Sequence, residues 1–173
     1  MLLISFLILT AVCSLISLIK NRKELSPLKV VEILLFYILF INVGLSGLLA
    51  FYGHAFLADK VAASIGWATG SPFQFEVAVA NLAFGVLGVL CIRFRDGFWL
   101  ATGIGYATFL FGAAYGHIRE MITAGNYAVN NAGLILYIGD IAMPALILIL
   151  LLMKTRWSHP TSWISRKAIP IDR

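Results

Sequence analysis

Asp140 is the residue whose type and position in this sequence are best suited to chemistry. It lies inside an apolar run, 131–153, that otherwise suits a helix crossing a bilayer. A carboxyl group near the middle of such a helix costs about 2.5–3.5 kcal/mol on insertion scales. Pro144 follows four residues later and cannot donate the backbone hydrogen bond that the carbonyl of Asp140 receives in a regular helix. The pattern indicates a site for a proton, a cation or a polar ligand, or else a structural pair with a buried Asn, Tyr or His.

Other polar side chains also fall in the expected membrane segments. A helix rises about 1.5 Å per residue, and on that scale most of them lie in the same half of the bilayer as Asp140. His117 is the only ionisable base within reach. We therefore expect Asp140 to be protonated and hydrogen-bonded, or paired with His117 or with a bound cation. The candidate ligand-binding residues are Asn42, Glu76, Asn81, His117, Glu120, Tyr137 and Asp140.

Each candidate also has a structural explanation. Asn42 and Asn81 are of the type that forms hydrogen bonds between membrane helices. Glu76, His117 and Glu120 lie close enough to the expected membrane surface to be solvated. These alternatives stay open at this point.

The sequence offers little for a metal, a cofactor or a covalent reaction. His117-x-x-Glu120 places two ligands on one helical face, but a single such pair is a weak metal motif and no second one accompanies it. The chain has no Gly-rich phosphate loop, no nucleophile–base motif and no cysteine pair at metal spacing. We expect no metal and no cofactor, and an enzyme is the least favoured class.

The composition predicts an integral membrane protein. Of 173 residues, 61% are hydrophobic and only 12% are charged, and the mean hydropathy is +0.93; soluble domains carry about 25% charged residues. The net charge of +5 is scattered over short loops without a basic face, which argues against nucleic-acid binding. We expect an all-α fold in which residues 1–154 form one compact bundle and residues 155–173 form a basic cytoplasmic tail. The five expected transmembrane helices cover about 2–19, 30–52, 73–92, 98–117 and 131–153.

The basic residues predict how the bundle is oriented. Eleven of the thirteen fall in the first and third loops and in the tail; Lys60 and Arg119 fall on the other side. The positive-inside rule then places the N-terminus outside and the C-terminus inside, in the inner (plasma) membrane. The first apolar run has no basic residue ahead of it, and we expect it to be a retained helix.

Local patterns add four expectations. Residues 55–67 have helical spacing and favour a short interfacial helix anchored by Trp67, although an ordered loop without a ligand role fits equally. The run Ser71-Pro72-Phe73-Gln74 predicts a capping box that starts the third helix. One face of that helix should carry Gln74, Asn81, Gly85 and Gly88. On the fourth helix, Gly105, Gly112 and Gly116 should form a close-packing seam.

The stretch from Ser71 to Asn81, S-P-F-Q-x-E-x-x-x-x-N, resembles a family of small prokaryotic multi-pass integral membrane proteins of unknown function. The runs G-H-I-R-E at Gly116–Glu120 and Gly139-Asp140 fit the same resemblance. The similarity covers most of the chain beyond the first helix. It implies a membrane location and no established activity.

Two functions follow from these patterns. In the first, an outward-opening polar pocket binds or passes a small amphipathic or cationic ligand or a proton. In the second, the protein is an accessory or structural membrane subunit whose buried polar residues only hold the bundle together. Room beside Asp140 would favour the first, and a polar network packed shut would favour the second. The expected partner is the lipid bilayer, and the oligomeric state is left open.

Overall fold

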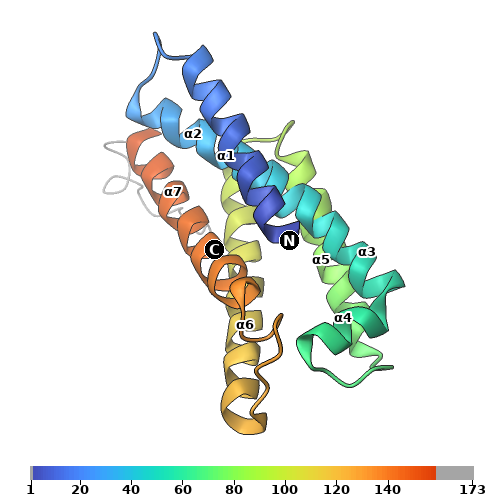
Figure 1. Ribbon diagram of the computed structural model, residues 1–173. Coiled ribbons are helices and arrows are strands. Elements are labelled where there is room, and N and C mark those ends of the chain that lie inside the picture. Colours follow the sequence, from blue (N-terminus) through green and yellow to red (C-terminus); the bar gives the residue numbers. More distant parts are fainter. Residues whose placement is uncertain (1, 159–173) are drawn as a thin grey trace, which may run out of the picture.

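The computed structural model describes residues 2–158 as helices joined by short loops, with no β-strand in that part of the chain (Figure 1). Within residues 2–158, five helices are long and apolar enough to cross a membrane, which confirms the predicted all-α fold with five candidate spans. The elements are α1 (Leu2–Lys20), α2 (Pro27–Tyr37), η1 (Ile38–Leu45), α3 (Ser46–Phe56), α4 (Ala58–Ile65), α5 (Phe73–Leu90), α6 (Gly97–Ala124), η2 (Ile135–Ala142) and α7 (Met143–Ser158).

The helices that could cross a membrane differ from the predicted segments mainly at their ends. The second spans Pro27–Phe56 through α2, η1 and α3, and the fifth spans Ile135–Ser158 through η2 and α7. Helix α6 runs to Ala124, so His117 and Glu120 lie within it rather than at its end. The part of the expected tail from residue 159 onward lies outside the described residues.

Local signals explain several of the helix ends. Ser26 precedes Pro27 and its side chain accepts a hydrogen bond from the backbone N–H of Lys29, which caps α2. Gly66 follows the last residue of α4 and Gly125 follows the last residue of α6, with positive φ angles of 80° and 62°. Such left-handed termini favour glycine because it has no Cβ.

The predicted capping box at the start of α5 is wrong. The side chain of Ser71 makes no capping bond to this helix, whose N-cap position is Pro72. Gln74 instead donates from Nε2 to the carbonyl oxygen of Ala58, at 2.6 Å. Its side chain is therefore used to hold α4 against α5, a long-range contact that a local motif cannot reveal.

Two of the membrane-length helices contain a π-helical segment of eight residues. Asn42 lies in η1 and Asp140 lies in η2. After η2, the backbone N–H of Met143 donates to the carbonyl of Ile138, five residues earlier. The next residue, Pro144, has no N–H to donate, which disturbs the regular α-helical pattern beside Asp140. π-Helical turns inside α-helices are frequent at functional sites.

Helix α5 packs against η1 and α3 through glycines on both sides. A Cβ atom built on Gly47 would lie 3.0 Å from the Cα of Gly85, and one built on Gly44 would lie 3.0 Å from the carbonyl carbon of Gly88. The backbones can approach this closely only because these residues have no side chains. The predicted Gly85–Gly88 face of α5 thus makes the close contact.

The predicted glycine seam on α6 is wrong for two of its three members. A Cβ built on Gly112 or Gly116 would meet no atom of the described chain within 4 Å, and Gly105 meets only the ring of Phe84. The close approach on α6 occurs instead at Gly103, which faces Ile147 and Leu151 of α7. Periodic spacing marked a face of small residues but did not show whether a helix covers it.

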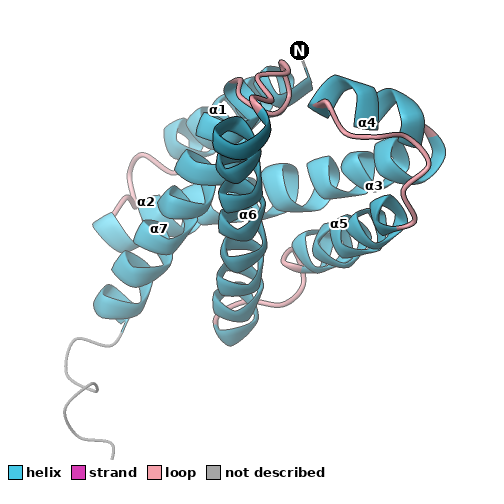
Figure 2. Ribbon diagram, turned by 90° about the horizontal axis from the view of Figure 1, so that it is seen from below, coloured by secondary structure: helices cyan, strands magenta, loops and turns pink. Residues whose placement is uncertain are grey.

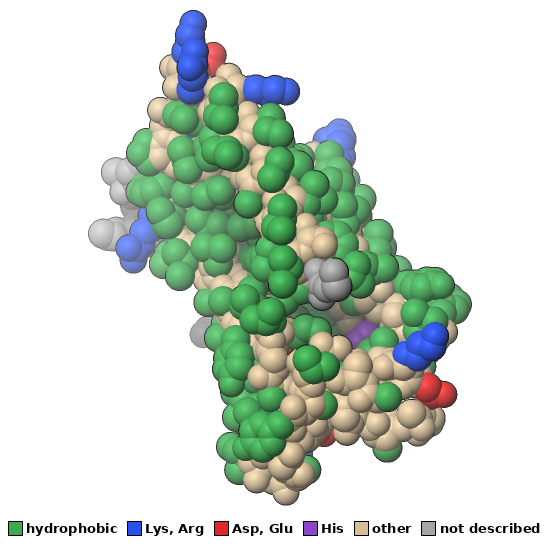
Figure 3. Space-filling model, in the orientation of Figure 1, with side chains coloured by type: hydrophobic (Ala, Val, Ile, Leu, Met, Phe, Trp, Pro, Cys, Tyr) green, Lys and Arg blue, Asp and Glu red, His purple; other side chains and the backbone are tan. Residues whose placement is uncertain are grey.

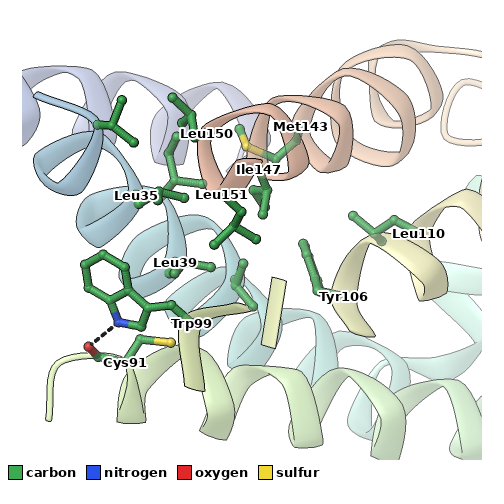
Figure 4. Close-up of a cluster of buried hydrophobic side chains, with 13 residues drawn as sticks. Leu35, Leu39, Cys91, Trp99, Tyr106, Leu110, Met143, Ile147, Leu150 and Leu151 are labelled. Carbon is green, nitrogen blue, oxygen red and sulfur yellow. Dashed lines mark hydrogen bonds between the residues drawn. The ribbon is translucent and has the colours of Figure 1, made fainter. Parts of the chain in front are cut away.

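The apolar core fills one half of the bundle, where α2, α6 and α7 meet (Figure 4). Trp99 is fully buried there and donates from its indole nitrogen to the carbonyl of Cys91, at 2.9 Å. This half ends in the loops 21–26 and 91–96, and we call that end of the molecule the basic end. The opposite end, which carries α4 and the loop 125–134, is called the α4 end (Figure 1).

A buried lysine joins three helices at the basic end. Lys154 of α7 is 8% exposed, and its ammonium group lies 2.8 Å from Asp96 Oδ1 and 3.6 Å from Glu32 Oε1. It also lies 5.9 Å from the centre of the Trp99 ring. Two carboxylates and an aromatic face therefore balance the charge of this lysine and close the basic end of the bundle.

Candidate functional site

The half of the bundle toward α4 contains a cavity of about 1090 Å³. Seen from below, α6 lies between α7 and α5 (Figure 2). Residues of α1, η1, α3, α4, α5, α6 and η2 line the cavity. Figure 3 shows a hollow on one face of the molecule with a histidine side chain inside it. Drug-sized ligands occupy pockets of about 300–1,000 Å³, so the cavity is large enough for one. The polar side chains that line it include Asn42, Ser46, His54, Asn81, Tyr106, His117, Arg119, Glu120 and Asp140.

Asp140 is the buried acid of this cavity. Its side chain is 9% exposed, and its Oδ2 atom has no hydrogen-bond partner among residues 2–158. The π-helical turn of η2 carries it. A buried polar atom without a partner is costly, because it has given up its hydrogen bonds to water. Asp140 is also one of the residues that line the cavity.

His117 is the basic group nearest to that atom. Its Nε2 lies 3.6 Å from Asp140 Oδ2, which is too long for a direct hydrogen bond but close enough for an ion pair if His117 is protonated. This bears out the expectation that the two residues approach each other. The other ring nitrogen, Nδ1, lies 2.7 Å from Oδ1 of Asn131, which is fully buried.

Trp67 and the loop after α6 cover His117 at the α4 end. The indole ring stacks on the imidazole with ring centres 6.2 Å apart and planes 16° from parallel. Asn126 donates from Nδ2 both to the carbonyl of Ile65 and to Oε2 of Glu120, at 2.9 and 2.8 Å. These bonds hold the segment after α4 over the cavity. Trp67 therefore forms part of the roof of the cavity.

A second, shallower cavity of about 630 Å³ lies on the other side of this roof. It shares Trp67, Val77, Glu120 and Ala124 with the large cavity. These four residues border both spaces, and we call them the partition. We call the smaller one the vestibule.

Asn42 lies at the end of the large cavity that faces the core. It donates from Nδ2 to Oγ1 of Thr10 on α1, at 2.6 Å. The backbone carbonyl oxygen of Asn42 accepts from the hydroxyl of Tyr106, at 3.4 Å, and from the hydroxyl of Ser46. Asn42 is therefore an interhelical hydrogen-bonding residue, and it also lines the cavity.

The cavity brings together five of the seven candidates: Asn42, Asn81, His117, Glu120 and Asp140. Asn81 donates to the carbonyl of Val77 in its own helix. Two candidates lie elsewhere. Glu76 is exposed, Tyr137 is 54% exposed, and neither lines the cavity. Regular α-helical spacing would put Tyr137 close to the face of Asp140, three residues later, but both residues lie in the π-helical segment η2, which changes the angular spacing of side chains.

The charges of the lining favour a cation over an anion. Arg119, Glu120 and Asp140 are its residues with formal charge, and they leave one net negative charge when the histidines are neutral. His54 also lines the cavity, and its Nδ1 has no hydrogen-bond partner in the described chain. Across residues 2–158 no three His, Cys, Asp or Glu side chains gather as metal ligands would.

Sequence reasoning did not identify Asn131 and gave Trp67 only a surface role. Asn131 stands at the edge of an apolar run, where it resembles a residue of the preceding loop. Its link to His117, fourteen residues earlier, depends on how the loop folds back. The fully apolar run that follows Asn131 was the only local sign that it would be buried.

Comparison with known proteins gives a family and no activity. No curated protein and no solved structure matches the chain. The model described as "Family of unknown function (DUF6790)" matches residues 1–160. The resemblance to an uncharacterised family is thereby confirmed at this level, and the chain belongs to the DUF6790 family.

Proposed function

We propose that this protein lies in a membrane and that its cavity binds or passes a small amphipathic or cationic ligand or a proton, with Asp140 as the anionic group. The observation that carries the proposal is Asp140, which lines a cavity of about 1090 Å³ and whose buried Oδ2 atom has no hydrogen-bond partner among residues 2–158. A carboxylate in such surroundings gains most from a ligand that brings a positive charge.

The rest of the lining supports an amphipathic cation. Aromatic rings of Trp67, Tyr106 and Phe109 face the cavity together with many aliphatic side chains. Aromatic faces attract cations, and the aliphatic surface favours the apolar part of an amphiphile. We therefore expect an organic amine of drug-like size rather than a bare metal ion.

The distribution of basic residues supports an orientation as well. Arg22, Lys23, Arg93 and Arg95 lie in the loops of the basic end. By the positive-inside rule, that end faces the cytoplasm and the α4 end, with its vestibule, faces outside. The site then opens toward the exterior or toward the outer half of the bilayer.

A structural role for the same residues is the alternative. The Asn42–Thr10 hydrogen bond favours it, because that bond does what interhelical polar contacts do in many membrane bundles. The room beside Asp140 favours the binding function, since a purely structural carboxyl group would be packed against its partners.

The test measures how tightly two probes of nearly equal size, 2-naphthylmethylamine and 2-naphthylmethanol, bind to the purified protein in lipid nanodiscs. We expect saturable binding of the amine and at least about tenfold weaker binding of the alcohol, a difference of about 1.4 kcal/mol. Asp140→Asn should lose the preference for the amine while folding normally. Asp59→Asn, which changes an exposed acid on α4, is the control and should behave as wild type.

Equal binding of the two probes by the wild-type protein would overturn the proposal. So would an Asp140→Asn variant that keeps the full preference for the amine. In either case the structural alternative would be the better account.

A further inference from the structure

The hydrogen bonds of Asn131 determine where His117 carries its proton. The amide nitrogen of Asn131 donates to the carbonyls of Asn126 and His117, at 2.7 and 3.3 Å. Since carbonyls only accept, this fixes the orientation of the amide, and its Oδ1 atom is the one that faces the imidazole. His117 must then donate from Nδ1 to Oδ1, at 2.7 Å. In the neutral imidazole the proton is on Nδ1, and Nε2 carries a bare lone pair.

That lone pair faces Asp140 Oδ2 across 3.6 Å. With no proton between them, a buried carboxylate would face a lone pair, and both atoms would lack a donor. With two protons, the buried imidazolium of His117 would face the neutral carboxylic acid of Asp140. The pair would then hold no negative charge to balance the imidazolium. One shared proton avoids both costs, whether it resides on Nε2 or on Oδ2. The pair is therefore suited to hold one proton.

We infer that this pair exchanges its proton for the bound cation, so that the site couples cation binding to proton release; the inference rests on the proposed function. In the resting site the proton lies between His117 and Asp140. When an organic cation binds at Asp140, the O–H or N–H bond to that proton breaks, and the proton passes to water. The atom that held the proton, an oxygen of Asp140 or Nε2 of His117, keeps the bonding electrons. His117 is then neutral and the carboxylate of Asp140 pairs with the cation, so the charge of the site stays the same before and after binding.

The other ionisable groups that face the cavity do not duplicate this arrangement. Glu120 is at the partition to the vestibule, where Asn126 donates to it. His54 on α3, Tyr106 and Arg119 on α6 line the same space, and no ion pair of theirs with Asp140 is present. Because Trp67 and Glu120 also line the vestibule, they lie on the short route from His117 to the α4 end, along which a released proton could leave.

The experiment uses tetraphenylphosphonium, a permanent cation that can neither bring nor lose a proton. Its binding to the wild-type protein is measured by calorimetry at several pH values, and released protons are counted with an indicator dye in weak buffer. We expect about one proton per bound cation, and an affinity that rises about tenfold per pH unit while the pair is protonated. Asp140→Asn should abolish the release. Asp59→Asn, which changes an exposed acid outside the cavity lining, should retain it.

The outcomes separate the two proposals. Binding without proton release, and with an affinity independent of pH, would overturn the exchange and leave the binding function intact. Absence of binding, together with absence of amine binding in the naphthyl test, would remove both. Proton release that survives Asp140→Asn but disappears in Glu120→Gln would place the proton on Glu120 and contradict the inference.

Difference infrared spectra of the unmutated protein, with and without the cation, give a check that depends on no variant. Deprotonation of a carboxylic acid or an imidazolium supports the exchange, and unchanged spectra contradict it.

Discussion

The backbone of Gly88 in α5 lies directly against the backbone of Gly44 in η1. A Cβ atom on Gly88 would collide with the nitrogen and Cα of Gly44 and with the carbonyl of Leu39. This contact, on the helix that carries Asn42, sets how closely α5 approaches it. The wall of the cavity formed by Asn42 and Asn81 depends on that spacing.

Gly88→Ala should therefore destabilise the bundle, by about 1–3 kcal/mol, because backbone atoms cannot move aside for a methyl group. Gly112→Ala is the matched control. It adds the same methyl group to α6, where a Cβ would meet no atom of residues 2–158 within 4 Å. Thermal unfolding in detergent, followed by size-exclusion chromatography, compares the two. Equal midpoints would show that the glycine contact is not tight.

Thr10→Val should weaken the attachment of α1. The substitution keeps the shape but removes the hydroxyl that accepts from Asn42 at 2.6 Å. Hydrogen bonds between membrane helices contribute about 0.6 kcal/mol on average and up to about 1.7 kcal/mol, so we expect a loss in that range. Thr108→Val is the control, since its hydroxyl bonds only to the carbonyl of Ile104 in its own helix. If both valine variants lose the same stability, the Asn42–Thr10 bond does not hold α1.

At the basic end, Glu32→Gln and Asp96→Asn should be markedly non-additive. Either single variant leaves Lys154 one carboxylate, whereas the double variant leaves a buried ammonium group with none. Asp96 is exposed and Glu32 is partly exposed, but Lys154 is buried. Leaving its charge without a carboxylate is costly, so the double variant should lose more stability than the singles together. A double-mutant cycle of unfolding midpoints measures this coupling. Additive effects on the unfolding midpoint would mean that water already screens the charge of Lys154.

The particular residues show what the sequence could and could not predict. Apolar runs of membrane length gave the five helices, because length and hydropathy are local properties. The acid at 140 indicated a site, and its nearest base, His117, was identified, because an ionisable group in an apolar segment has few local partners. The wrong predictions concern long-range contacts. Gln74 bonds to Ala58 rather than capping its own helix, Gly112 faces a cavity rather than a neighbouring helix, and Tyr137, in the π-helical segment, does not line the cavity.

The orientation can be tested with single cysteines. In a background with Cys13 and Cys91 replaced by serine, Asp59→Cys should react with a membrane-impermeant maleimide added to intact cells. Arg95→Cys should react only after the cells are opened. Both native side chains are exposed, so protein burial does not decide the result. Labelling of position 95 from outside would reverse the orientation and place the cavity on the cytoplasmic side.

The central claim is that a cation occupies the space beside Asp140. The most direct measurement is a crystal structure of the complex with 6-bromo-2-naphthylmethylamine, with bromine located by its anomalous signal. The account predicts a bromine peak inside the cavity walled by α3, α5 and α6, with the amine nitrogen within hydrogen-bonding distance of Asp140 Oδ2. A structure with this space filled only by water or side chains, and with bromine found only on the outer apolar faces of the helices, would contradict it.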